Sequence, residues 1–299
     1  MEMIDGESAY AGMRTAYRIA VTDRSDLERP GIRPLVTIHG GPGCTHDYLL
    51  SMADLVTPDR PVIFYDQIGN GRSTHAREAP AGFWSIDLFL GELDALLERL
   101  GFASDYDVLG QSWGGMLAAE HAVRRPPGLR RLVIANSPAS MPLWRRAAAQ
   151  LRAELPEDVR RTLEFHEAAG SIRSDEYRRA SDVFYARHVC RLDPLPDEVA
   201  ATFAWIDDDP TVYHAMNGPT EFHVVGSLRD WTIEEQLGLI EVPTLVINGR
   251  YDEATDDTIA PFVSRIADVR HRVFEGSSHM PHWEERASYM AEVDAFLAG

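Results

Sequence analysis

The stretch Val108-Leu109-Gly110-Gln111-Ser112-Trp113-Gly114-Gly115 decides the fold of this chain. An apolar run, residues 106–109, leads into it, and a helix-forming run, residues 116–123, follows it. This order predicts a strand, a sharp turn and a helix, with Gly-x-Ser-x-Gly at the turn. A serine at such a turn is held in a strained backbone conformation clear of the sheet, and the two glycines remove β-carbons that would collide where strand and helix meet. The pattern therefore predicts that Ser112 is a nucleophile, provided that its partners follow downstream.

Composition limits the class of protein. With 299 residues, 44% of them hydrophobic, the chain is long enough to bury a large core. The formal charge of -18, from 29 basic and 47 acidic residues, disfavours binding to nucleic acid and to anionic membranes. Cys44 and Cys190 are too few for a disulfide framework or a thiolate metal site. Residues 1–10 lack the apolar core of a signal peptide, and no run approaches 18 apolar residues, so we expect a soluble, cytoplasmic protein.

Strand and helix patterns alternate on both sides of the serine turn. Before the turn and just after it, the expected strands are residues 13–21, 35–38, 62–65 and 132–135, and the expected helices are 47–55 and 86–100. After residue 232 the alternation resumes with strands 242–247 and 270–274 and helices 256–266 and 286–297. Such alternation predicts an α/β protein with a mostly parallel sheet and helices on both faces, as in the α/β-hydrolase fold.

Between these two parts, residues 142–230 carry little strand signal. The amphipathic segments expected there are 143–155, 157–169, 176–191 and 197–205. We therefore expect an α/β core domain formed by residues 1–137 and 232–299, and a helical cap domain, residues 138–231, over the carboxyl edge of the sheet.

A serine nucleophile requires a base and an acid that orients the base, in the chain order Ser, Asp or Glu, His in this fold. Asp252 follows the strand 242–247, and His279 follows the strand 270–274. Both positions are at carboxyl ends of strands, where open parallel sheets bind ligands. The sequence therefore predicts the triad Ser112, Asp252 and His279. The alternatives that lie further from their strands are Asp256, Asp257 and His282.

The negative oxygen of a tetrahedral intermediate needs two N–H donors. We expect one from Trp113, which follows the nucleophile, and one from Gly41 in the loop His39-Gly40-Gly41-Pro42-Gly43. Glycines there let the main chain approach the substrate, so Gly40 is also expected at the substrate. The loop is not a phosphate-binding loop, because no Gly-Lys-Ser/Thr follows it.

Four motifs together resemble the proline iminopeptidases, most closely the branch of the tricorn-interacting aminopeptidases and the L-amino-acid amidases. The motifs are His39-Gly-Gly-Pro-Gly43, Asp66-Gln-x-Gly-x-Gly-x-Ser73, Gly110-x-Ser-Trp-Gly-Gly115 and Asn217-Gly-Pro-Thr-Glu-Phe222. The resemblance runs from about residue 35 to the C-terminus. It implies removal of an N-terminal residue from a short peptide, or hydrolysis of an amino-acid amide or arylamide, without a cofactor or a metal.

Members of that family recognise the substrate's free α-amino group with glutamates, and the matching positions are Glu221 and Glu253. A buried carboxylate pair is costly unless a cation lies between the charges, and an α-ammonium is such a cation. The alternative is that Glu221 forms a cap or an ion pair within the helical segment and that Glu253 is solvated. Aromatic residues that either line the pocket or belong to the core are Trp113, Tyr213, Phe222 and Trp231.

Two other functions compete with this interpretation. An esterase, lactonase or thioesterase uses the same triad, and fold alone cannot separate these chemistries. A binding protein without catalysis would not need the order Ser, Asp, His. Serine at position 112 excludes the aspartate nucleophile of dehalogenases and epoxide hydrolases. The side chain of the released residue and the oligomeric state are left open.

Overall fold

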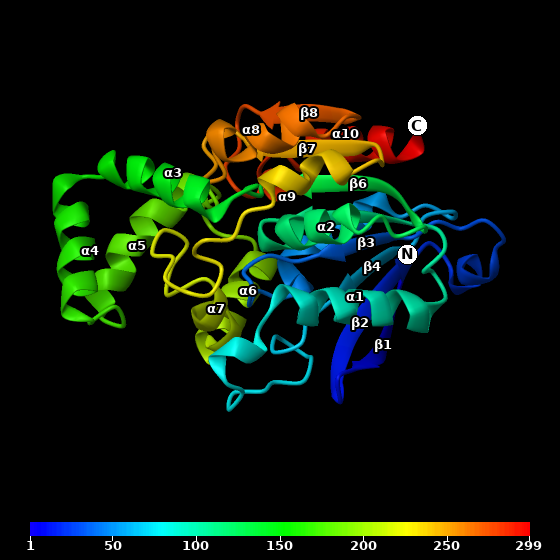
Figure 1. Ribbon diagram of the computed structural model, residues 1–299, viewed down its shortest axis with the longest axis horizontal. Coiled ribbons are helices and arrows are strands. Elements are labelled where there is room, and N and C mark those ends of the chain that lie inside the picture. Colours follow the sequence, from blue (N-terminus) through cyan, green and yellow to red (C-terminus); the bar gives the residue numbers. More distant parts are fainter.

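One eight-stranded sheet has the order β1-β2-β4-β3-β5-β6-β7-β8 (Figure 1). The structure of the protein is a computed structural model that describes residues 1–299, with the exception of the side chain of Ala81. The strands are β1 (Glu2–Tyr10), β2 (Met13–Val21), β3 (Leu35–Ile38), β4 (Val62–Tyr65), β5 (Tyr106–Gln111), β6 (Leu129–Ala135), β7 (Thr244–Gly249) and β8 (Val269–Phe274). From β4 to β8 all pairs are parallel, whereas β1 and β2 pair antiparallel at one edge. The expected fold class is confirmed.

Successive side chains of the central strands enter opposite faces of the sheet, so the core has two halves. Val108 packs in the half covered by α1 (Ile86–Leu100), α2 (Trp113–Val123) and α8 (Asp256–Arg265). Leu109 packs in the half covered by η2 (His46–Leu55) and α10 (Arg286–Ala298). Parallel strands covered on both faces are expected to be apolar throughout, and β3 and β4 are buried at every position. Short helices connect these elements: η1 (Arg24–Glu28), η3 (Ala81–Phe83), η4 (Glu234–Leu239) and α9 (Pro281–Glu284).

Five helices lie between β6 and η4, in the segment expected to form the cap. They are α3 (Met141–Ala153), α4 (Glu157–Ala169), α5 (Asp175–His188), α6 (Asp197–Asp208) and α7 (Thr211–Met216). Figure 1 shows α3, α4 and α5 extending away from the sheet, whereas α6 and α7 lie closer to it. We call residues 138–231 the helical insertion.

Besides the short helices η1, η3, η4 and α9, the strand β1 and the helix α7 were not predicted. The strand β1 is mostly exposed, and Ser8 is its one buried residue, so its apolar alternation is weak. It forms because it pairs along its whole length with β2 across a turn in which Ala11 and Gly12 have positive φ. The helix α7 is only six residues long. Within the described residues, no helix has the length and apolar character needed to cross a membrane.

Candidate functional site

The nucleophile turn connects β5 directly to α2. Ser112 has φ 57° and ψ -125°, a strained conformation for a residue with a side chain, and its N–H donates to Ala135 O at 2.9 Å. A β-carbon at Gly114 would lie 2.0 Å from Ile38 O, so the helix approaches β3 this closely only because residue 114 is glycine. Local strain of this kind is typical of functional positions.

Asp252 and His279 are in direct contact. His279 Nδ1 lies 2.7 Å from Asp252 Oδ1, which also accepts from Ala254 N–H at 2.8 Å. Asn136 Nδ2 donates to Asp252 Oδ2 at 2.6 Å. The Asp252 carboxylate is almost fully buried, and these donors hold it in one orientation. An acid in this arrangement fixes the ring and the tautomer of the histidine.

The alternative residues are placed differently. Asp256 and Asp257 are exposed in the first turn of α8, and Asp256 accepts from Arg250 and Asn248. His282 is fully buried among aromatic rings, and burial lowers its pKa to about 3. The geometry therefore favours the pair Asp252 and His279 over these three.

The protonation of His279 predicts the pH dependence. Burial lowers the pKa of His279, but the charge of Asp252 and its hydrogen bond outweigh burial, so the pKa is raised above 6.5. An imidazolium cannot accept a proton from Ser112, so activity is lost below this pKa and gained as the pH rises through it. We expect kcat/KM for a simple acyl ester to rise with a midpoint above 6.5.

A simple acyl ester is the substrate of choice for this pH profile, because it has no amine group that could bind to the enzyme or titrate itself. In Asp252→Asn the midpoint of the pH profile of the residual activity should move to lower pH, because the charge that raises the pKa of His279 is gone. A wild-type midpoint below 6.5 would contradict the assignment of His279 as base.

The loop after β3 brings two glycines to the nucleophile. A β-carbon at Gly40 would lie 2.9 Å from Ser112 Cβ. The N–H of Gly40 already donates to Tyr48 Oη at 2.7 Å, so it is not free for a substrate. Gly40 can therefore provide close approach of the main chain but no N–H donor, and its place at the substrate stays a prediction. Gly41, Ser112 and Trp113 line one small cavity, of about 10 Å³.

Gln67, which follows β4, connects this loop to α2. Its backbone N–H and its side-chain amide donate to His39 Nε2 and His39 O, both at 3.0 Å. Its Oε1 accepts from the Trp113 indole at 2.9 Å. Burial lowers the pKa of His39 to about 4, which keeps the ring neutral and able to accept this bond. The indole side chain of Trp113 is therefore part of the packed interior. Its backbone N–H is at the start of α2, where helix amides lack an intrahelical partner.

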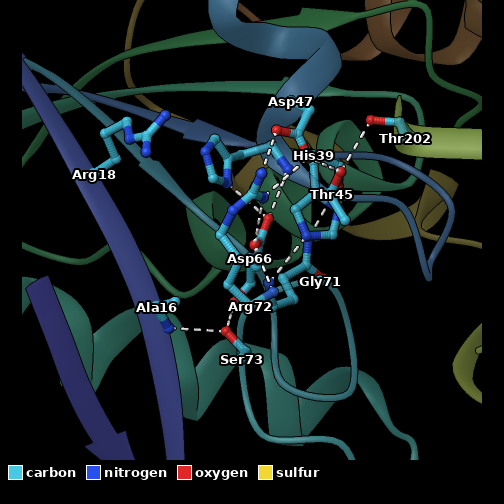
Figure 2. Close-up of polar contacts among 12 residues, drawn as sticks. Ala16, Arg18, His39, Thr45, Asp47, Asp66, Gly71, Arg72, Ser73 and Thr202 are labelled. Carbon is cyan, nitrogen blue, oxygen red and sulfur yellow. Dashed lines mark hydrogen bonds and ion pairs between the residues drawn. The ribbon is translucent and has the colours of Figure 1, made fainter. Parts of the chain in front are cut away.

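A buried network of charged side chains connects the loop after β3 to the loop after β4 (Figure 2). Asp66 is fully buried and accepts from His46 N–H, His46 Nδ1, Arg72 N–H and Arg72 Nη1 at 2.7–3.2 Å. The guanidinium of Arg72 also forms a bidentate ion pair with the carboxylate of Asp47. Although burial raises the pKa of Asp66, the hydrogen bonds and charge of His46 lower it well below its usual value. The network ties residues 45–47 to residues 66–72.

Glu221 and Glu253 are both close to the candidate triad. Glu253 is buried, neither of its carboxylate oxygens has a hydrogen-bond partner in the described residues, and Oε1 lies 3.9 Å from His279 Nε2. Glu221 is partly buried and accepts from Tyr213 Oη at 2.6 Å. Burial raises the pKa of both carboxyl groups, and that of Glu253 is raised further by the charges of Glu221 and Asp252. The expectation that Glu253 is solvated is thereby excluded.

Glu221 also lines two cavities. One is the small cavity beside Ser112, and the other has a volume of about 900 Å³ and lies between α5, α6 and α7. Tyr213 lines the larger cavity. Two of the aromatic residues singled out from the sequence lie elsewhere: Phe222 packs against Phe184 in an apolar cluster of the helical insertion, and the indole of Trp231 donates to Glu120 on α2. The expectation that Phe222 binds substrate is therefore corrected, because it belongs to a core.

Several polar residues that hold the site were not predicted. They are Tyr48, Gln67, Gln111, Asn136 and Trp144, whose indole donates to Glu221 O and stands edge-on to His279. Asn136 has a positive φ of 52°, but nothing in the sequence alone shows it. Gln67 is the second residue of the motif Asp66-Gln-x-Gly-x-Gly-x-Ser73, so its position in that motif was the one signal in the sequence that could have identified it as a site residue.

Comparisons with known proteins show which family the chain resembles. Residues 33–286 match the family described as alpha/beta hydrolase fold. The chain is 39% identical to a proline iminopeptidase of Saccharolobus solfataricus over 89% of this chain and 84% of the relative. It superposes on the crystal structure of a proline iminopeptidase of Mycobacterium smegmatis with a TM-score of 0.90 at 47% identity, covering 99% and 98% of the two chains. The crystal structure of VinJ superposes with a TM-score of 0.94 at 51% identity, over the same shares of the chains.

Proposed function

Because the chain belongs to the proline iminopeptidase family of the α/β-hydrolase fold, we propose that it is a serine aminopeptidase that releases an N-terminal amino acid from short peptides or hydrolyses amino-acid amides. The observation that carries this proposal is a pair of carboxyl groups near the triad: partly buried Glu221 lines the cavity beside Ser112, and buried Glu253 lies 3.9 Å from His279 Nε2. Neither carboxylate oxygen of Glu253 has a hydrogen-bond partner in the described residues, and an α-ammonium would supply one. The cytoplasmic location expected from the sequence stays a prediction.

The proposed reaction has two halves. Ser112 Oγ attacks the substrate carbonyl while His279 takes the hydroxyl proton, and the N–H groups of Gly41 and Trp113 stabilise the oxyanion. His279 then protonates the leaving amine as the C–N bond breaks, which leaves an ester on Ser112. Water, deprotonated by His279, attacks this ester, and the proton returns to Ser112 as the free amino acid is released. Asp252 stabilises the imidazolium in both halves.

Recognition of the amine explains the raised pKa values of the glutamates. In the free enzyme, burial favours the neutral forms of Glu221 and Glu253. An ammonium between them favours the ionised forms, so the charges appear when the substrate supplies their counter-charge. Glu221 also borders the 900 Å³ cavity between α5, α6 and α7.

The Glu221→Gln variant tests this recognition. We expect kcat/KM for an aminoacyl arylamide to fall by roughly 30-fold to several thousand-fold, because the partly buried ammonium loses one counter-charge. The loss should be absent for a simple acyl ester. N-acetylation of the arylamide should harm the wild type as much as the substitution does, and the two losses should not multiply.

A control and a contrary result complete the test. Glu120→Gln removes another partly buried carboxylate, one that accepts from Trp231 rather than facing Ser112, and it should leave the preference for the free amine unchanged. If the wild type cleaves N-acetylated and free substrates equally well and Glu221→Gln has no effect, there is no amine site. The enzyme would then be an esterase or lactonase acting on a substrate without an amine.

A further inference from the structure

The hydroxyl of Tyr48, on η2, connects two loops of the candidate site. It accepts from Gly40 N–H at 2.7 Å and donates to Gln111 Oε1 at 2.5 Å. Gly40 directly precedes Gly41 in the oxyanion loop, and Gln111 directly precedes Ser112. One hydroxyl therefore sets the distance between the loop that offers a donor and the turn that offers the nucleophile.

The same contacts extend to the histidine loop. Gln111 Nε2 donates to His279 O at 3.0 Å, so Gln111 uses both ends of its amide within the site. Tyr48 and Gln111 are 2% and 1% exposed, and water has almost no access to replace either partner. Buried polar chains of this kind are rigid as long as every group is paired.

Tyr48 is itself held firmly. Its backbone O accepts from the Trp283 indole at 2.7 Å, and its backbone N–H donates to Thr202 Oγ1 at 3.3 Å. Burial raises the pKa of the Tyr48 hydroxyl well above 10, so it stays protonated and keeps its bond to Gln111.

The ion network described above anchors the start of η2. Thr202 on α6 lies 3.0 Å from Thr45 Oγ1, and Thr45 donates to Asp47 at 2.7 Å (Figure 2). Asp47 is paired with Arg72, which is also held by Asp66. The position of the Tyr48 ring is therefore set by side chains from the core and from the helical insertion.

We propose that Tyr48 is a positioning residue of the reaction: its hydroxyl occupies the Gly40 N–H and holds Gly41 N–H at the place of the oxyanion next to Ser112. Tyr48 acts through these groups and does not touch the reacting atoms. Without the hydroxyl, Gly40 N–H and Gln111 Oε1 would be buried and unpaired, and both loops would shift to find new partners. The inference rests on the proposed serine mechanism but not on amine recognition.

Tyr48→Phe tests the proposal, because it removes one oxygen and retains the ring. We expect kcat to fall roughly 10- to 100-fold, since a displaced donor weakens stabilisation of the transition state, while KM changes by less than about threefold. The loss should be equal for an aminoacyl arylamide and a simple acyl ester. The rate at which a phosphonylating reagent labels Ser112 should fall in parallel, and this readout needs no substrate.

Tyr65→Phe and Tyr289→Phe are matched controls. Both tyrosines are fully buried, and their hydroxyls have no hydrogen-bond partner in the part of the chain that the structure describes. Both variants should keep kcat within about twofold of the wild type. The proposal is wrong if Tyr48→Phe keeps full kcat, raises KM alone, or loses no more than these controls.

A second variant separates positioning from a loss of stability. Gln111→Met removes the acceptor of the Tyr48 hydroxyl, and its loss in kcat should not multiply with that of Tyr48→Phe, because both break the same connection. Multiplying losses would overturn the proposal. If the wild type proves inactive on every amine substrate while Tyr48→Phe still slows labelling of Ser112, the proposed aminopeptidase function fails and the positioning role stands.

Discussion

Ser112→Ala is expected to lose on the order of 10⁴-fold or more in kcat, with a residual rate supported by the oxyanion donors and binding alone. The structure supports this expectation through the strained backbone at Ser112, at φ 57°, between β5 and α2. The substitution turns the CH₂OH side chain into CH₃ and removes only the hydroxyl oxygen, so the fold should not change. The measurement is kcat on an aminoacyl arylamide together with stoichiometric labelling by a phosphonylating reagent.

Ser51→Ala is a suitable control for this variant. Ser51 is also buried, on η2, and its hydroxyl has no hydrogen-bond partner within the described residues. It should retain wild-type activity and labelling. Near-normal turnover by Ser112→Ala, or a label found on another serine, would exclude the serine mechanism.

Asp252→Asn is expected to lower kcat by roughly 10⁴-fold, as removal of the orienting acid does in other triads. Both oxygens of Asp252 accept hydrogen bonds, from His279, Ala254 and Asn136. Asparagine has one acceptor oxygen, so its NH₂ group must face a donor or force His279 into the wrong tautomer. The variant should therefore fold and bind substrate but fail in proton transfer.

Asp257→Asn is the matched control, because Asp257 lies five residues away and is exposed on α8. It should keep full activity. His279→Ala should be as severe as Asp252→Asn, and neither loss should multiply with that of Ser112→Ala, since the three residues act as one unit. A larger loss in Asp257→Asn than in Asp252→Asn would mean that the acid is misassigned.

The sequence by itself determined the order of most elements and the class of fold. Strands such as β4 and helices such as α1 and α4 have the predicted bounds, because their apolar periodicity and their flanking residues act over a few positions. The turn at Ser112 is equally local, since it depends on glycines two residues away on either side. Relatives whose chains match over nearly the full length agree with the family inferred from these motifs.

Only the tertiary structure decided which distant groups meet. Asp252 and Asp256 look alike in the sequence, but one is buried against His279 and the other forms an exposed pair with Arg250. Likewise, the sequence places Gly40 in the glycine loop after β3, but only the structure shows that its N–H is bonded to Tyr48. These outcomes depend on strand order and on how loops from separate strands pack at one edge of the sheet. No local pattern encodes such contacts, because the partners are far apart in the chain and their distances are set by the whole fold.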